Sequence, residues 1–282
     1  MSSELSPPQR FRQIVSGPEE NLNLAEAALL IAGDEYPELD VGSYLARIDR
    51  MAGSVKERLR PDAGVAEIIV VLNRFLFEEQ GFKGNTADYY DPRNSFLSDV
   101  LERKRGNPVT LAVLYLEVGR RLGLPLDGIL FPGHFLVKCK LPDGMAIIDP
   151  YAGGASLDIA DLQRRISLMR NGTEPPRAAV MGMLGAAGKK EILVRMLRNL
   201  KEIYSRRKDW ERALYTIDRI ISVRPELAEE YRDRGTMYLK LECARAALFD
   251  LQAYLKMLPG ARDADGVRMR IVELQAKAAR LN

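Results

Sequence analysis

His134, the only histidine of the chain, and Asp149 are the residues best suited to act together chemically. Alternating polar and apolar residues predict strands over 134–140 and 145–149, joined by the turn Leu141-Pro142-Asp143-Gly144. Antiparallel pairing through that turn would bring Asp149 opposite His134, to within about two residues. A carboxylate there could accept the imidazole N–H and fix its tautomer, as in a nucleophile–base–orienter set. The structural alternative is that the histidine supports the hairpin and that Asp149 only ends a strand.

The elements that would position this pair are mostly helices. Apolar residues at helical spacing predict helices before the hairpin over 21–32, 41–51, 65–80, from near Phe96, and from Pro108 to Leu122. Asn94 or Ser95 could cap the helix that starts near Phe96, and Pro108 stands where proline is favoured. A further strand is predicted over 126–131 and a further helix over 159–170. Helices combined with one small antiparallel sheet predict an α+β fold.

The C-terminal third contains an internal repeat. Tyr204, Ala213 and Pro225 recur 34 residues later as Tyr238, Ala247 and Pro259. A 34-residue helix–turn–helix period with these residue types resembles the tetratricopeptide repeat, and about two helix pairs fit the segment. The last segment, 266–281, would be a capping helix. Residues 171–190 are rich in Gly, Pro and Ala and are the predicted linker, so we expect domains over 1–180 and 191–282.

The order of a helix N-terminus, a histidine strand and an aspartate strand resembles the transglutaminase-like, or papain-like, superfamily over residues 95–156. The run Arg120-Arg121-Leu122-Gly123-Leu124-Pro125 is similar to the turn that ends the helix in that superfamily. More narrowly, the chain resembles the bacterial SirB-one family, which combines this domain with tetratricopeptide-like helices. The stretches that carry this likeness lie at 72–77, 81–85, 89–95, 106–111, 131–137 and 149–151.

The resemblance implies N-terminal helices and a transglutaminase-like core with a small antiparallel sheet. It also implies a catalytic cysteine at the helix N-terminus, but counting back from Gly123 places Pro108 at that position. His134 and Asp149 match the other two members of the triad. A base without a nucleophile performs no acyl transfer. The substitutes we considered are Cys139, Cys243, Thr110, Ser95 and Tyr90, with Cys139 on the wrong strand face and Cys243 expected to pack as a small hydrophobic residue.

The predicted loop over residues 84–95 can be interpreted in two ways. Tyr89, Tyr90, Arg93 and Asn94 could form a wall of the cleft near His134, with Arg93 holding an anion. Pro108 and Thr110, in the first turn of the following helix, would complete this binding surface. Alternatively, the tyrosines pack on the core and Arg93 pairs with a nearby aspartate.

The composition of the chain limits which class of protein it can be: globular, membrane-spanning, secreted, or dependent on a metal or cofactor. The 282 residues are 46% hydrophobic and 29% charged, as in an ordinary globular protein. No run approaches the ~18 apolar residues of a membrane span. The first residues lack the pattern of a signal peptide, and two cysteines in different predicted domains suit a reducing cytoplasm. We therefore expect a cytoplasmic protein without membrane association. One histidine, two separated cysteines and the absence of phosphate-loop or dinucleotide-loop motifs predict no metal and no cofactor.

Three functions remain. The first is a non-catalytic regulatory module that binds a protein or peptide through the cleft and the helical repeats. The second is a hydrolase or acyl transferase that uses His134 and Asp149 with an unusual nucleophile. The third is direct nucleic-acid binding, because residues 189–282 carry 21 Lys and Arg against 14 Asp and Glu. The sequence does not favour the third, since no aromatic stacking pattern accompanies these charges.

Overall fold

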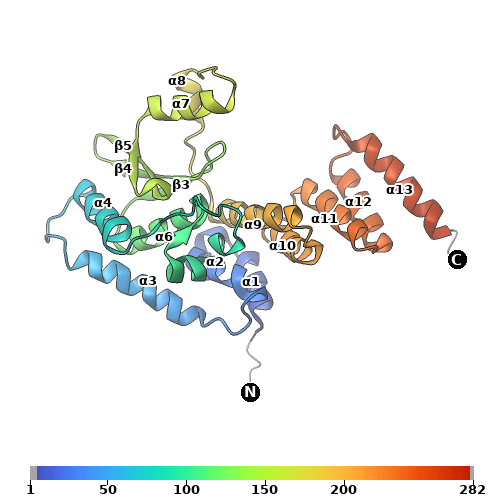
Figure 1. Ribbon diagram of the computed structural model, residues 1–282, viewed down its shortest axis with the longest axis horizontal. Helices are drawn as coiled ribbons and strands as arrows, with labels where there is room; N and C mark the ends of the chain where they lie inside the picture. Colours follow the sequence, from blue (N-terminus) through green and yellow to red (C-terminus); the bar gives the residue numbers. More distant parts are fainter. Residues whose placement is uncertain (1–4, 280–282) are drawn as a thin grey trace. The chain divides into compact units, whose positions relative to one another are not determined.

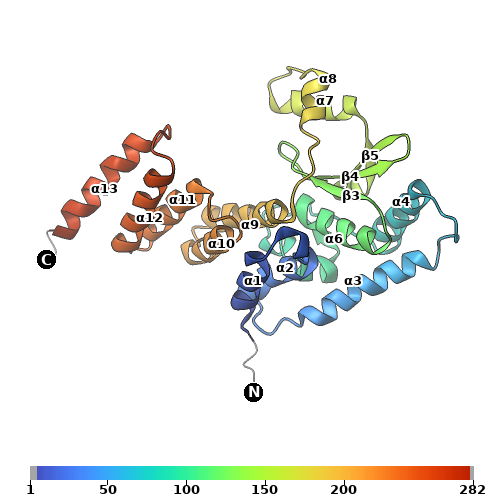
Figure 2. The same ribbon diagram turned by 180° about the vertical axis from the view of Figure 1, so that it is seen from behind.

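The computed structural model describes residues 5–279, and the chain divides into two compact units, residues 1–196 and 197–282. The ribbon views in Figures 1 and 2 show a mixed unit in blue to yellow and an all-helical unit in orange to red. The fold is α+β, as predicted. Among the described residues, no helix is both long enough and apolar enough to span a membrane. Each unit is described by itself below.

Helix α6 (Pro108–Arg121) is the centre of the first unit, because every residue from Pro108 to Gly119 is buried. The predicted helices that precede α6 are present with shifted ends. They and the additional elements are α1 (Pro7–Ser16), η1 (Glu19–Asn21), α2 (Leu24–Leu30), η2 (Ile31–Asp34), α3 (Val41–Lys56), α4 (Val65–Asn73) and α5 (Leu97–Arg103). The helix predicted over 65–80 changes at Arg74 into a π-helix, η3 (Arg74–Glu79), in which Gln80 N–H bonds the carbonyl of Phe75 at 2.9 Å.

The sheet has four antiparallel strands in sequence order, β3 (Leu126–Ile129), β4 (Leu136–Leu141), β5 (Gly144–Asp149) and β6 (Ala155–Leu157). The predicted turn is present, because Leu141 pairs with Gly144 around the two-residue loop Pro142-Asp143. The strand predicted over 134–140 begins only at Leu136, however, and His134 lies in a bend before it. The chain turns there through Gly133, whose φ of +66° suits glycine. The strand predicted over 126–131 likewise ends at Ile129.

The sheet lies between α6 on one side and the pair α7 (Ile159–Met169) and α8 (Arg177–Gly182) on the other (Figures 1 and 2). Ile129, Phe131, Leu136 and Ile147 pack with Leu162 and Ile166 of α7 and with Val180 and Leu184 of the following segment. Residues 171–190 were interpreted as a linker, but Val180 and Leu184 of this segment belong to the core of the first unit. Its Gly and Pro content shortens α8, but its apolar residues close the core over the sheet.

Short elements connect these layers. Strand β1 (Lys83–Gly84) pairs in parallel with β2 (Arg105–Gly106), so the loop between them begins and ends beside the start of α6. This loop contains the 3₁₀ turn η4 (Pro92–Asn94), and a second such turn, η5 (Pro150–Ala152), follows β5. The helix expected from Phe96 starts at Leu97 without a side-chain cap, because Asn94 and Ser95 make other hydrogen bonds.

The second unit is built from α10 (Trp210–Val223), α11 (Ala228–Lys240), α12 (Ala244–Met257) and α13 (Ala264–Ala279), with the end of α9 (Lys189–Arg206) before them. The repeated alanines, Ala213 and Ala247, are fully buried. Gly235 faces α12 so closely that a Cβ atom would lie 3.1 Å from Leu251. Small residues at these positions let the helices approach, as the 34-residue period predicts. Part of the predicted capping helix, from residue 280 on, lies outside the described residues.

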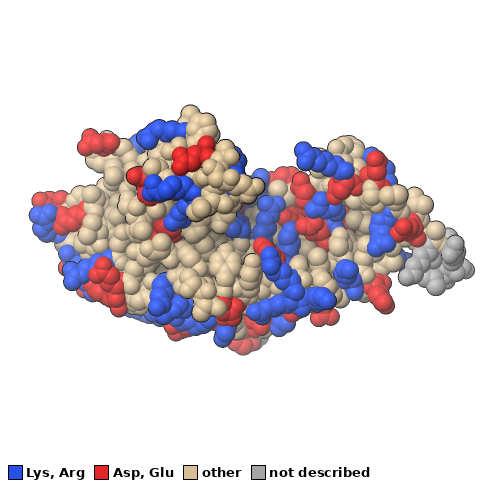
Figure 3. Space-filling view, turned by 45° about the horizontal axis from the view of Figure 1, so that its top comes forward, with Lys and Arg blue, Asp and Glu red and all other residues tan. Residues whose placement is uncertain are grey.

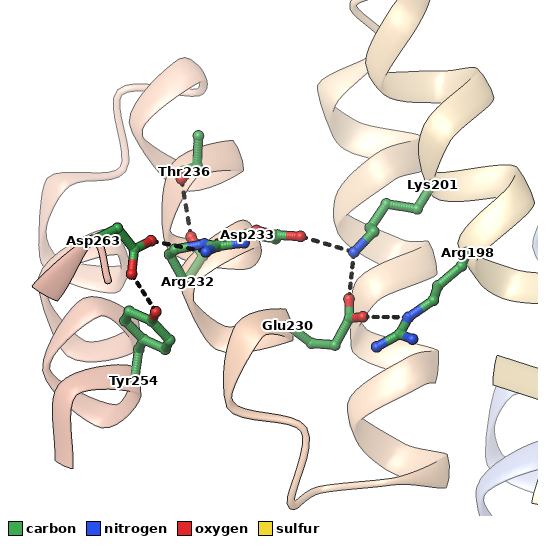
Figure 4. A network of polar contacts seen from close by, with 8 residues as sticks. All are labelled: Arg198, Lys201, Glu230, Arg232, Asp233, Thr236, Tyr254 and Asp263. Atoms are coloured by element: carbon green, nitrogen blue, oxygen red, sulfur yellow. Dashed lines mark hydrogen bonds and ion pairs between the residues drawn. The ribbon is translucent and has the colours of Figure 1, made fainter. Parts of the chain in front are cut away.

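A ladder of ion pairs joins α9 to α11, and α11 to Asp263 in the segment before α13 (Figure 4). Glu230 of α11 is almost fully buried and accepts hydrogen bonds from Arg198 at 2.8 Å and from Lys201 at 2.6 Å, both on α9. Lys201, which occupies the position of Gly235 in the preceding repeat, also binds Asp233 at 2.8 Å. The larger residue places its charged end beside α11, where Glu230 and Asp233 neutralise it.

Candidate functional site

His134 and Asp149 are in contact. The Nε2 atom of His134 lies 2.9 Å from Oδ1 of Asp149, with the histidine in the bend before β4 and the aspartate at the end of β5. Val137 pairs with Ile148 in the hairpin, so one further step of the register places Asp149 opposite Leu136, two residues from the histidine. The expected proximity is therefore present. His134 itself precedes β4, so it does not share the alternation of strand faces on which Cys139 was expected to face away from it.

Asp149 is held ionised by its surroundings. Its side chain is about 1% exposed, and Oδ2 accepts a hydrogen bond from Arg165 of α7 at 2.8 Å. Oδ1 also accepts the backbone N–H groups of Tyr151 and Ala152, at 3.1 and 3.2 Å, which caps η5. Burial opposes ionisation, but the hydrogen bond and charge of His134 and those of Arg165 outweigh it, so the pKa of Asp149 is below its ordinary value.

This geometry selects one tautomer of His134. An ionised carboxylate only accepts hydrogen bonds. The proton of the imidazole is therefore on Nε2, which donates the hydrogen bond to Asp149. The other nitrogen, Nδ1, is then a hydrogen-bond acceptor in the neutral ring, and it has no partner among the described residues. The side chain is 16% exposed. His134 can therefore accept a hydrogen bond from a ligand or remove a proton from it.

The start of α6 contributes no nucleophile to this pair. Asn107 is the N-cap, and its side-chain oxygen accepts the backbone N–H and the hydroxyl of Thr110, both at 3.0 Å. The Asn107 amide in turn donates to the hydroxyl of Ser95 at 2.9 Å. Ser95 and Thr110 are fully buried, and Pro108 fills the first helical position. The hydroxyl groups considered as substitutes here bond to Asn107 and not to His134.

A family model described as the transglutaminase-like superfamily matches residues 42–198. The chain belongs to this superfamily. A tetratricopeptide-repeat model matches residues 200–272. The chain is 43% identical over 260 residues to a UPF0162 protein of Xylella fastidiosa, covering 91% of each chain. It is 30% identical over 257 residues to a UPF0162 protein of Pseudomonas aeruginosa, covering 91% of this chain and 93% of that protein. It is 26% identical over 246 residues to Protein SirB1 of Salmonella typhimurium, covering 86% and 90%. The resemblance stated from the sequence is thereby confirmed.

One tyrosine contacts His134 in the transglutaminase-like domain, and two more lie in the loop before α5. The ring of Tyr151 meets the imidazole edge-to-face, with centroids 5.9 Å apart. Tyr151 fits closely against Gly84, where a Cβ atom would come within 2.5 Å of the tyrosine ring. Burial and then the charge of Tyr89 raise the pKa of Tyr151, which indicates that Tyr89 is near. Tyr89 and Tyr90 are 40% and 42% exposed and lie edge-to-face at 5.3 Å. Tyr151 therefore offers aromatic surface beside the histidine, and a position of Tyr89 and Tyr90 beside His134 stays a prediction.

Asn94 organises the loop that carries the tyrosines. Its amide donates to the carbonyls of Asp88 at 2.7 Å and Tyr89 at 3.2 Å, and its side-chain oxygen accepts from Asn85 at 3.0 Å. Its own carbonyl accepts the backbone N–H of Asn107. Asn94 is about 1% exposed. It therefore reaches a ligand only through the loop conformation that it maintains.

Arg93 pairs with a nearby aspartate, as one of the two interpretations held. Its guanidinium bonds Asp91 at 3.0 Å, and Arg103 bonds the same carboxylate at 2.8 Å. Burial opposes ionisation of Asp91, but these hydrogen bonds and charges outweigh it and lower the pKa of the carboxyl group. The Arg93 side chain is 55% exposed. Its role as an anion-binding residue stays a prediction.

The two cysteines belong to different units, and neither is bonded to His134 in the described part of the chain. Cys139 of β4 is fully buried, and burial raises the pKa of its thiol, which disfavours the reactive thiolate. Cys243 is exposed at the start of α12, so the expectation that it packs as a small hydrophobic residue was wrong. Within residues 5–279, no group of three or more His, Cys, Asp or Glu side chains is placed to hold a metal ion.

Sequence reasoning missed three residues of the site. Arg165 follows Asp149 by 16 residues and lies on another element, so no local pattern connects them. Asn107 was visible as a helix cap, but its link to Ser95 depends on the loop returning to the helix start. Tyr151 stood within the stretch Asp149-Pro150-Tyr151, which offered a signal for it.

Proposed function

We propose that this chain is a non-catalytic binding and regulatory module. Its transglutaminase-like cleft would hold a peptide-like or small ligand, and its tetratricopeptide helices would dock a protein partner. The observation that carries the proposal is the start of α6, where Pro108 occupies the position of the superfamily cysteine and has no nucleophilic atom. The hydroxyl groups of Ser95 and Thr110 are buried and bound to Asn107.

The chemistry left in the cleft suits recognition. Nδ1 of His134 accepts a hydrogen bond while Asp149 and Arg165 fix the orientation of the ring. A ligand with an N–H or O–H group would satisfy Nδ1, and its apolar part would lie on exposed tyrosine rings. The amide groups of a peptide have this combination.

The helical repeats supply the surface for a larger partner. Tyr215 and Phe249 are 56% and 69% exposed and stand 34 residues apart, at equivalent positions of α10 and α12. Large apolar side chains exposed in register along a repeat array mark a protein-binding face. Positive and negative side chains are interspersed on the face shown in Figure 3, which does not favour a phosphate backbone as the partner.

One assay separates this proposal from an enzyme that uses His134 and Asp149. Wild-type protein and the His134→Ala variant are compared for turnover of an activated ester and of a fluorogenic peptide amide. We expect equal rates, because no nucleophile is bonded to the imidazole. Turnover that depends on His134 would contradict the proposal and support a hydrolase with an unusual nucleophile.

A second experiment tests the repeat surface. Proteins retained from a cell extract by the wild-type chain are compared with those retained by a Tyr215→Ser/Phe249→Ser variant. The matched control is Leu168→Ser/Met169→Ser, which removes two exposed apolar side chains of the first unit. We expect a partner that is lost only with the first pair. Equal retention by all three proteins would contradict a role for these aromatic residues.

A further inference from the structure

A cavity of about 510 Å³ lies in the first unit between the segment 35–39, helix α3 and helix α5. This volume falls in the usual range of small-molecule sites. Its lining shares no residue with the His134 site and consists of Glu35, Tyr36, Pro37, Glu38, Leu39, Tyr44, Ser98, Asp99 and Glu102. Nothing described so far assigns a role to it.

The charges of the lining have one sign. Four of the lining residues are carboxylates, two are tyrosines, and none is Lys, Arg or His. Glu102 is paired with Arg47 at 2.7 Å from outside the cavity. The remaining carboxylates face a partly apolar space formed with Pro37 and Leu39. Such a space attracts a cation.

Asp99 is the acidic group most in need of a partner. Its carboxylate accepts one hydrogen bond, from the hydroxyl of Tyr36 at 2.9 Å, and no Lys, Arg or His of the described chain lies within ion-pair distance of it. Arg93 and Arg103, whose charges act on Asp99, bond to Asp91 instead. Burial raises the pKa of Asp99 even though the Tyr36 hydrogen bond and the two arginines oppose that effect.

Ser98 gives an independent indication of a ligand. This residue is 3% exposed and lines the cavity, and its hydroxyl has no hydrogen-bond partner. Buried hydroxyl groups in folded proteins are almost always bonded. A donor that entered beside Asp99 could bond this oxygen as well as the carboxylate.

The two tyrosines complete a cation site. The ring of Tyr36 is held edge-to-face against Phe96, with centroids 5.9 Å apart. Burial and the hydrogen bond to Asp99 raise the pKa of Tyr36 to about 12, so the phenol stays neutral at physiological pH. Neutral aromatic faces beside a carboxylate bind ammonium and guanidinium groups.

We infer that this cavity binds the primary ammonium group of an aliphatic chain, with Asp99 as the ion-pair partner, Ser98 as an acceptor and Tyr36 and Tyr44 around the methylene groups. The ammonium could belong to a free diamine or to a lysine side chain of another protein. Both present the same charge on the same kind of chain, so the experiment distinguishes the source.

Isothermal titration calorimetry with the full chain tests whether the cavity binds an ammonium group. The probes are 1,5-diaminopentane, the neutral 1,5-pentanediol, and acetylated Gly-Lys-Gly and Gly-Gln-Gly amides. We expect saturable binding of at least one ammonium probe, weakening with added salt, and no binding of the diol or the glutamine peptide. Binding of the diamine alone identifies a free amine as the ligand, and binding of the lysine peptide alone identifies a protein side chain. Absence of saturable binding by both ammonium probes would overturn the inference.

Two variants test whether the ammonium group binds in this cavity. Asp99→Asn keeps the shape and should weaken binding by about tenfold or more, because the charge-assisted bond is lost. Asp143→Asn removes one carboxylate from the exposed hairpin turn and should leave the affinity unchanged. Thermal unfolding of both variants establishes that each is folded. Equal weakening by the two substitutions would show a general charge effect and overturn the assignment of the site.

Discussion

At the residue scale, Asp149 connects three parts of the transglutaminase-like domain. Its carboxylate accepts hydrogen bonds from His134, from Arg165 and from two backbone N–H groups. These bonds hold β5, the bend before β4 and α7 in one arrangement. The same group therefore orients the imidazole and stabilises the fold.

Replacement of Asp149 by Asn should reduce stability in a pH-dependent way. The folded-state pKa of this carboxyl is lowered, so its stabilising contribution is present above the ordinary pKa and is lost as the pH falls through the folded value. At pH 7 we expect Asp149→Asn to lower the free energy of unfolding by roughly 2 kcal/mol. Urea unfolding at pH 7 and in acid below about pH 4 measures the difference. A difference of the same size at both pH values would contradict this account.

Asp99 should behave in the opposite way. Its folded-state pKa is raised, so its ionisation destabilises the folded protein at neutral pH, and this cost disappears as the pH falls below the ordinary value. Without added amine, Asp99→Asn should unfold at the same temperature as the wild type or higher at pH 7. The advantage should shrink in acid. A clearly lower unfolding temperature at pH 7 would show that the carboxylate stabilises the structure.

The protonation of His134 can be observed directly, because the chain has one histidine. We expect ¹⁵N NMR at a pH where the ring is neutral to show a protonated Nε2 and an unprotonated Nδ1. In Asp149→Asn, a neutral amide can also donate, so the preference for this tautomer should weaken. The opposite tautomer in the wild type would contradict the hydrogen-bond assignment.

At the element scale, buried charge joins helices of the repeat unit. Glu230 in the first turn of α11 bonds Arg198 and Lys201 of α9, and Arg232 bonds Asp263 at 2.8 Å beyond α12 (Figure 4). Tyr254 of α12 bonds the same Asp263 at 2.5 Å. Polar contacts therefore run from α9 to α11, and from α11 and α12 to Asp263 just before α13.

Removal of Glu230 should leave two cations without their buried partner. We expect Glu230→Ala to cost on the order of 2 kcal/mol, because Arg198 and Lys201 lose the buried carboxylate that both bond, while Lys201 keeps Asp233. The matched control is Glu229→Ala, an exposed acid in the same helical turn, which shares the helix-dipole effect and should cost much less. Urea denaturation followed by circular dichroism compares the two. Similar decreases in the free energy of unfolding for the two variants would show that the ion pairs of Glu230 contribute little to stability.

At the scale of the whole molecule, the chain consists of two compact units that meet inside α9. Asp149 and Glu230 belong to different units and share no bonding partner. The domain limits of 1–180 and 191–282 expected from composition stay a prediction, as does a cytoplasmic location.

The two units should respond separately to substitution. In hydrogen-exchange mass spectrometry, Asp149→Asn should raise exchange in residues of the first unit and Glu230→Ala in residues of the second. The double variant should show the sum of the two effects, because substitutions at sites without shared bonding partners add to within about 0.5 kcal/mol. Increased exchange in both units from one substitution would show strong coupling between them.

The sequence by itself determined the α+β class, the helical repeat and the pairing of His134 with Asp149. These depend on local patterns: residue periodicity, a hairpin turn and a 34-residue repeat, each of which acts within or between neighbouring elements. Pro108 at the start of α6 was also readable, because proline at a first helical turn is a local signal.

Only the tertiary structure decided the rest. Arg165 reaches Asp149 from α7, and Val180 and Leu184 close the sheet from a segment whose composition suggested a linker. The cavity beside Asp99 forms where a loop before α3 meets α5, about sixty residues further along the chain. No periodicity encodes such contacts, because packing between elements distant in sequence sets which polar groups are buried and which are left without partners.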